Sequence, residues 1–291
     1  MKTKLLSLTL LAAALAGPVS TLSAQESNPR PVHAASVSAP DPAIEIKHLA
    51  QLFRAGDLAG LAQGLVPREQ WEKVRAEFEA KRNKPTSDTE RERFAREIQR
   101  LTAPDAIDKF IAGLEPELTK ARAQWPGMLL MASGAMQVAV NSPEAKLTDA
   151  QREALRSALP GVQRWMASTD LLSTDMMRRA LTVLADAGRR TGITDIDQLK
   201  SLPLEGVLER VSPMLTAGKE AARIYGVDLD AVADSLKVDV LERGLDTARV
   251  RMTVTLFGAP VWSEHDLVLV DGHWYGKQVQ VDFHDTHDLE G

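Results

Sequence analysis

The side chains best suited to chemistry lie near the C-terminus, which holds four of the six histidines: His265, His273, His284 and His287. The run 282–288, DFHDTHD, brings imidazole and carboxylate groups together, and both are ligands for zinc, nickel or copper. A metal site also needs a rigid frame and a supporting shell of hydrogen bonds, whereas this run belongs to a polar terminal segment. We therefore predict no metal site and no cofactor.

General base chemistry is conceivable at His265 and Asp266, because an imidazole beside a carboxylate can take up a proton. Neighbouring residues of a strand point to opposite faces of the sheet, however, so these two side chains are poorly placed to bond each other. The sequence contains no Gly-x-Ser-x-Gly, His-Glu-x-x-His or Gly-x-x-x-x-Gly-Lys pattern. It also has no cysteine, which excludes disulfides, thiol catalysis and cysteine-bound metals. We predict no catalytic residue.

Aromatic residues near the predicted sheet are the better candidates for contact with a ligand. Trp262, Trp274 and Tyr275 lie close together in sequence, and aromatic side chains on a sheet can line a pocket. Trp274 follows a turn and is predicted to pack in the core, whereas Trp262 is the better candidate for an exposed contact. The predicted ligand-binding residues are Trp262, His265 and Tyr275.

The N-terminus has the three parts of a secretory signal peptide. Lys2 and Lys4 precede an apolar run from Leu5 to Ala16, and the small residue Ala24 offers a cleavage site. The run is shorter than the ~20 apolar residues of a membrane-spanning helix. We expect a signal peptide over 1–24, export to the periplasm or, as an alternative, secretion, and no stable membrane insertion after cleavage. Residues 25–41, rich in Ser, Ala and Pro, are predicted to be a flexible linker.

The region 42–236 has the pattern of many short helices. Hydrophobic residues recur at helical spacing, and Ser87–Glu90 and Thr148–Gln151 both fit the capping box. Prolines are expected to divide the region further, because proline lacks the N–H that a helix interior needs. On this basis Pro160 interrupts a helix, and Pro203 and Pro213 start separate helices.

From Lys237 the hydrophobic period changes from helical to alternating. The stretch 249–257, RVRMTVTLF, places apolar side chains on one face and polar ones on the other, as in a strand with one buried face. Asp271-Gly272 is a two-residue hairpin signal. The predicted fold class is α+β: a long multi-helix N-terminal region packed on a C-terminal four-stranded antiparallel meander over 237–281, followed by a polar tail over 282–291.

The stretch Trp125–Val140, WPGMLLMASGAMQVAV, is the most apolar part of the chain after the N-terminus. Between Pro126 and Val140 it carries no charge. A helix that is apolar on all sides is normally buried. We therefore predict that this helix forms the centre of a helical layer and that Met131 and Met136 are almost fully buried.

The C-terminal stretch also resembles a known family. The helix 229–236, the strand start 237–241, and the sequences DTARV at 246–250, FG at 257–258 and LVDGHWY at 269–275 are similar to the sheet of small exported bacterial proteins of the nuclear transport factor 2-like type. The resemblance covers about Asp228 to Val281 and implies a cone-shaped α+β fold for that part. Members of this family include enzymes and binding modules, so the resemblance implies no single activity.

Composition restricts the class of partner. The chain has 40 acidic and 35 basic residues, a net charge of -5, whereas nucleic-acid binding needs clustered positive charge. We therefore expect an exported binding or interaction module for an envelope protein or a small apolar ligand, without nucleic acid. Two alternatives stay open: a pocket-type hydrolase or isomerase on the cone-shaped fold, and a structural or oligomerising envelope protein. The sequence leaves the oligomeric state open.

Overall fold

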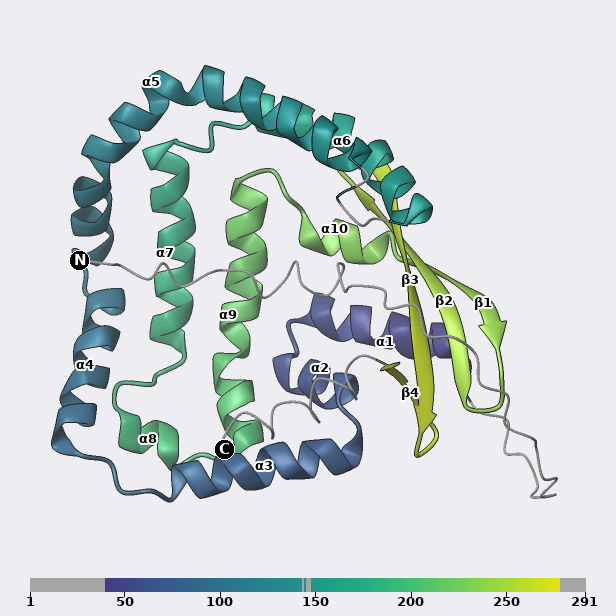
Figure 1. Cartoon of the computed structure of the whole chain (residues 1–291). Helices are drawn as coiled ribbons and strands as arrows, with labels where there is room; N and C mark the ends of the chain where they lie inside the picture. Colours follow the sequence, from purple (N-terminus) through teal and green to yellow (C-terminus); the bar gives the residue numbers. More distant parts are fainter. Residues whose placement is uncertain (1–39, 143, 145–147, 278–291) are drawn as a thin grey trace. The chain divides into compact units, whose positions relative to one another are not determined.

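The computed structural model describes residues 40–142, 144 and 148–277, all in one compact unit that begins at Pro40 (Figure 1). In these residues ten helices precede one antiparallel sheet, which confirms the predicted α+β class. The helices are α1 Pro42–Ala55, α2 Leu58–Leu65, α3 Arg68–Arg82, α4 Asp88–Thr102, α5 Ala106–Asn141, α6 Asp149–Ser168, α7 Thr174–Arg190, α8 Ile196–Lys200, α9 Leu204–Ile224 and α10 Leu229–Asp234. The strands are β1 Lys237–Arg243, β2 Thr247–Leu256, β3 Ala259–Val270 and β4 His273–Gly276.

Helix starts follow the predicted capping signals. The side chain of Ser87 accepts a hydrogen bond from the backbone N–H of Glu90, and the Glu90 side chain accepts one from the Ser87 backbone. Thr148 and Gln151 form the same reciprocal pair at the start of α6. Each pair satisfies N–H groups that have no partner inside the helix.

The predicted helix start at Pro203 is confirmed, because α9 begins at Leu204 directly after it, whereas the boundaries predicted at Pro160 and Pro213 are wrong. Helix α6 continues through Pro160, and α9 continues through Pro213 instead of beginning there. Helix α5 contains both Pro116 and Pro126 and runs for 36 residues, so the apolar stretch is only its second half. An internal proline removes one backbone hydrogen bond and bends the helix. Packing on neighbouring elements offsets that loss here, and Figure 1 shows α5 following a curved path past the end of α7.

The sheet has the strand order β1-β2-β3-β4, so each strand pairs with the next along the chain. Asp271 and Gly272 both have positive φ angles, as the predicted two-residue hairpin requires. The turn between β2 and β3 also has two residues. Phe257 and Gly258 occupy it with positive φ, and Pro260 already pairs with Thr255 inside β3.

Helix α1 is attached to the sheet by its first turn. Glu45 accepts a hydrogen bond from the backbone N–H of Trp274, and its Oε1 lies 2.8 Å from Nδ1 of His273. The indole Nε1 of Trp274 donates to the carbonyl of Pro40 at 2.6 Å. Trp274 is buried, as predicted. The core face of the sheet is well filled beside it, with Val250 fully buried and Leu267 6% exposed.

The second half of α5 contradicts the predicted burial. Met131 is 75% exposed and Met136 is half-buried. Only one side of the helix packs inward, where Ser133 accepts a hydrogen bond from Gln163 of α6 and Val140 is buried. Because the stretch is apolar on all sides, an apolar half faces outward, with Leu130 77% and Val138 70% exposed.

Candidate functional site

Helices α7 and α9 form a layer with one apolar face. Apolar side chains recur along each helix at spacings of three and four, which places them on one side. The apolar side chains on that side are only half-buried. We name this surface the α7–α9 apolar face; it consists of Met177, Leu181 and Leu184 of α7 and Val207, Val211 and Leu215 of α9.

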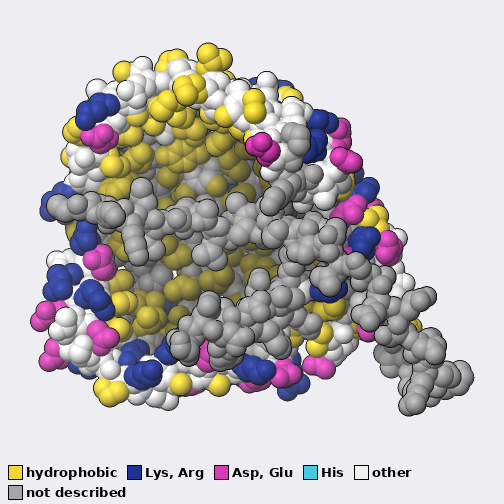
Figure 2. Space-filling view, in the orientation of Figure 1, with side chains coloured by type: hydrophobic (Ala, Val, Ile, Leu, Met, Phe, Trp, Pro, Cys, Tyr) yellow, Lys and Arg dark blue, Asp and Glu magenta, His cyan; other side chains and the backbone are white. Residues whose placement is uncertain are grey.

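Two glycines show that this face is open. Gly188 lies on the side of Leu181 and Leu184, and Gly218 lies on the side of Val211 and Leu215. A Cβ atom added to either glycine would meet no described residue within 4 Å. Figure 2 shows hydrophobic side chains lining a hollow bounded by α5 and α6 on one side and α3 on the other. The layer thus lacks a second layer over its apolar face among the described elements that contact it.

The opposite side of the same two helices is polar. It carries a cleft of about 370 Å³ lined by Arg178, Arg179, Thr182, Val183, Glu220 and Ile224. Arg178 pairs there with Asp108 of α5. The apolar side chains of α7 and α9 therefore gather on one side of the layer, and the charged ones on the other.

The predicted ligand-binding residues do not converge. Trp262 pairs with Thr253, Tyr275 pairs with Val268, and His265 pairs with Val250. Because side chains alternate along a strand, Trp262 and Tyr275 lie on one face of the sheet and His265 lies on the other, beside the buried Val250. The guanidinium carbon of Arg251 lies 4.5 Å from the centroid of the Trp262 ring, which covers part of that indole.

His265 has the surroundings of a core histidine. Its Nε2 lies 2.8 Å from Oγ of Ser263, two residues away on the same face. Burial lowers the pKa of His265, because desolvation disfavours the imidazolium; the charge of Asp266 opposes this shift. The Asp266 carboxylate belongs to the other face and accepts a hydrogen bond from Arg249 at 3.0 Å. Burial likewise raises the pKa of Tyr275.

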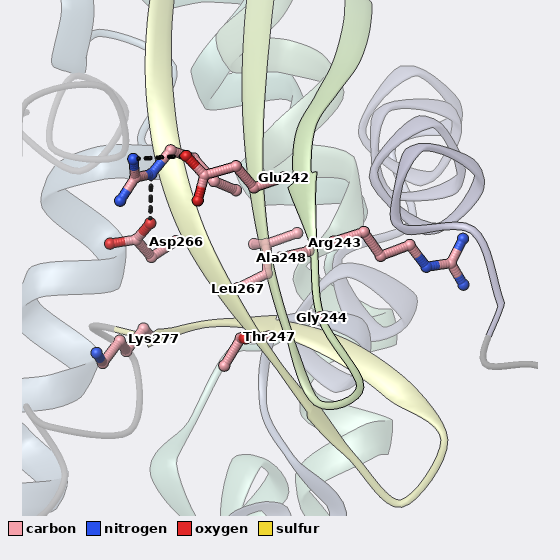
Figure 3. Close-up of a pocket in the computed structure, with 9 residues that line it drawn as sticks. Glu242, Arg243, Gly244, Thr247, Ala248, Asp266, Leu267 and Lys277 are labelled. Atoms are coloured by element: carbon pink, nitrogen blue, oxygen red, sulfur yellow. Dashed lines mark hydrogen bonds and ion pairs between the residues drawn. The ribbon is translucent and has the colours of Figure 1, made fainter. Parts of the chain in front are cut away.

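A charged cleft of about 460 Å³ lies at one end of the sheet (Figure 3). Glu242 and Asp266 both point toward Arg249, which bonds them at 3.2 and 3.0 Å, while Arg243 extends to the other side of the sheet. The hydrogen bond to Asp266 raises the pKa of Arg249. Because one guanidinium engages both carboxylates, neither carboxylate is free to act as a base. The cleft is lined by both acidic and basic side chains, so its electrostatic potential is not strongly of one sign.

Two absences concern only the described part of the chain. No three His, Asp or Glu side chains gather there in a way that would hold a metal ion. The histidine and aspartate run 282–288 lies outside the described residues. No helix of the described ranges is both long enough and apolar enough to cross a membrane.

The sequence does not predict the α7–α9 apolar face, because helical spacing shows which side of a helix is apolar but not what covers it. The signal that points to an open face is the position of Gly188 and Gly218 inside that stripe, since glycine weakens a helix interior.

No family model matches the chain, and no significantly similar curated protein or solved structure was found.

Proposed function

We propose that the protein is an exported binding protein that acts in the periplasm and takes up an amphipathic helix of a partner polypeptide on the α7–α9 apolar face. The observation that carries the proposal is the partly exposed apolar stripe along two neighbouring helices, with open space at Gly188 and Gly218 among the described residues. Burial of such a stripe is favourable in proportion to its apolar area.

The shape of the site favours a helix over a small molecule. Two adjacent helices form a groove between them, and a third helix fills it at the usual interaxial distance of about 8–10 Å. Between Met177 and Gly188 the stripe extends over roughly 17 Å at ~1.5 Å per residue. An amphipathic helix of about three turns matches that length, whereas small ligands favour more enclosed pockets.

The sheet supports binding over catalysis. Its core face is filled by Val250, Leu267 and Trp274, so it leaves little room for a substrate beside His265. We also propose that residues 228–281 form a sheet of the nuclear transport factor 2-like type. In this proposal the sheet supports α1. Export rests on the predicted signal peptide 1–24, which lies outside the described residues.

The test uses the chain from Gln25 and two fluorescent peptides of leucine and lysine. One peptide forms an amphipathic helix, and the other has the same composition in a scrambled order without an apolar face. We expect the first peptide to bind and the scrambled one not to bind. Leu181→Glu should weaken binding by at least about tenfold, because a charge would be buried in the contact.

Arg179→Glu is the matched control, because Arg179 lies on the same helix but lines the polar cleft on the other side. It should leave the affinity within about twofold, a change of less than 1 kcal/mol. Equal binding of both peptides, or equal loss in the two variants, would show that charge or general stickiness explains the signal. Cross-linking of position 181 to residues 25–39 of the same chain would also reject the proposal.

A further inference from the structure

The outward side of α5 carries a second apolar surface, distinct from the α7–α9 apolar face. Gly127, Met131, Gly134 and Val138 follow one another at spacings of four, three and four, so they form one seam along the helix. All four are exposed. We name them the α5 outer seam. Leu130 and Ala135, also exposed, flank it on either side.

The two glycines of the seam have open surroundings among the described residues. A Cβ atom added to Gly127 or Gly134 would meet nothing within 4 Å. Glycine inside a helix costs conformational entropy and weakens the helix, so these positions are unfavourable for the isolated protomer. Glycine on a helix surface lets another helix approach closely, as in contacts that place small residues between two helices.

We propose that the α5 outer seam binds the same seam of a second copy of this chain, in an antiparallel pair with a two-fold axis between positions 132 and 133. In that register Met131 lies opposite Gly134 of the second copy, and Val138 lies opposite its Gly127. Leu130 lies opposite Ala135. Each large side chain thus meets a small one, and the pattern repeats when the copies are exchanged, as a two-fold contact requires.

Charge and area are compatible with a second copy. Residues 126–140 carry no charge, so two identical surfaces meet there without like-charge repulsion. Leu130, Met131 and Val138 are each at least 70% exposed. A contact between two seams would cover these three side chains, and burial of exposed apolar area favours association.

The test measures the mass of the chain from Gln25 by sedimentation equilibrium between about 1 and 100 µM, a range that detects a micromolar Kd. We expect a reversible dimer. Gly134→Leu should raise the dimer Kd by at least about tenfold, because the added side chain overpacks the contact with Met131. No described residue lies within 4 Å of a Cβ atom added at Gly134, so the variant monomer should melt at the same or a higher temperature.

Gly113→Leu is the matched control, because Gly113 lies on the same helix with equally open surroundings but outside the proposed contact. It should dimerise like the unaltered chain. The register is tested with cysteines, which the chain otherwise lacks. Mild oxidation of a mixture of Met131→Cys and Gly134→Cys chains should give the mixed disulfide faster than either chain alone forms one with itself, since only the mixed pair comes within bonding distance.

A chain that stays monomeric over the whole range would overturn the proposal, as would a dimer that Gly134→Leu leaves unchanged. Flotation of the monomer with vesicles of phosphatidylethanolamine and phosphatidylglycerol, kept or strengthened in Gly134→Leu because the added side chain is apolar, would instead identify the seam as a lipid contact. None of these results depends on the α7–α9 apolar face, so the two proposals fail separately.

Discussion

The ammonium of Lys219 lies 2.7 Å from the carboxylate of Asp230, although the Lys219 side chain is only 5% exposed. Its Nζ also donates to the carbonyls of Phe53 and Arg54 at 3.1 and 2.7 Å. The three donors of one ammonium are thus all used. They join α9 to the C-terminal end of α1 and to α10, and the ammonium complements the negative end of the α1 dipole.

Removing this charge should destabilise the fold. Lys219→Met leaves two carbonyls and a carboxylate without their donor, and we expect a loss of about 3 kcal/mol, the low end of the range for a broken buried ion pair. The low end applies because Asp230 retains Arg223 at 3.1 Å. Urea unfolding followed by circular dichroism measures the change. Lys120→Met removes an exposed partner of Glu117 and should cost less than about 1 kcal/mol; equal losses would contradict the assigned role of Lys219.

Two glycines inside helices should respond in opposite ways to alanine. A Cβ atom at Gly161 of α6 would come within 2.6 Å of the Phe257 carbonyl oxygen, whereas one at Gly188 of α7 meets nothing. Gly161→Ala should therefore lower the melting temperature, because α6 must shift away from the turn between β2 and β3. Gly188→Ala should stabilise the protein by up to about 1 kcal/mol through helix propensity. Thermal unfolding of both variants measures these changes. Stabilisation by Gly161→Ala would be inconsistent with the close contact to Phe257.

The burial of His265 should make stability fall in mild acid. Burial lowers the pKa of His265 in the folded state, so both states are neutral above the unfolded pKa of about 6.5. As the pH falls through that value, the unfolded chain takes up the proton first, and stability is lost until the folded pKa is reached. His265→Gln should therefore lose less stability than the unaltered chain between pH 7.5 and pH 5. Identical slopes in urea unfolding at several pH values would argue against a buried neutral imidazole.

Glu205 should stabilise the contact between α3 and α9 at neutral pH. Burial, its largest influence, would raise its pKa, but hydrogen bonds from Arg75 and Trp71 help to hold the pKa of Glu205 below the ordinary 4.5. The stabilisation is therefore present above pH 4.5 and is lost as the pH falls through the lower folded value. Glu205→Gln should lower the melting temperature at pH 7, and the difference should shrink in acid. Glu209→Gln, exposed on the same helix, should change little at either pH.

The sequence by itself determined the local features of this protein. The capping pairs at Ser87 and Thr148, the alternation along β2 and the hairpin at Asp271-Gly272 depend on residues within a few positions of one another, and all are present in the structure. The α+β class follows from the change of the hydrophobic period at Lys237 from helical to alternating, which is also a local feature of the sequence.

Only the tertiary structure decided which apolar surfaces are covered. Pro160 and Pro213 lie inside helices because packing on neighbouring elements outweighs one lost hydrogen bond. Met131 is exposed because α5 packs on one side only, and spacing within a helix says nothing about neighbours that are distant in sequence. His265 lies beside the buried Val250 because the pairing of β3 with β2 fixes that register, which the sequence of β3 alone does not specify.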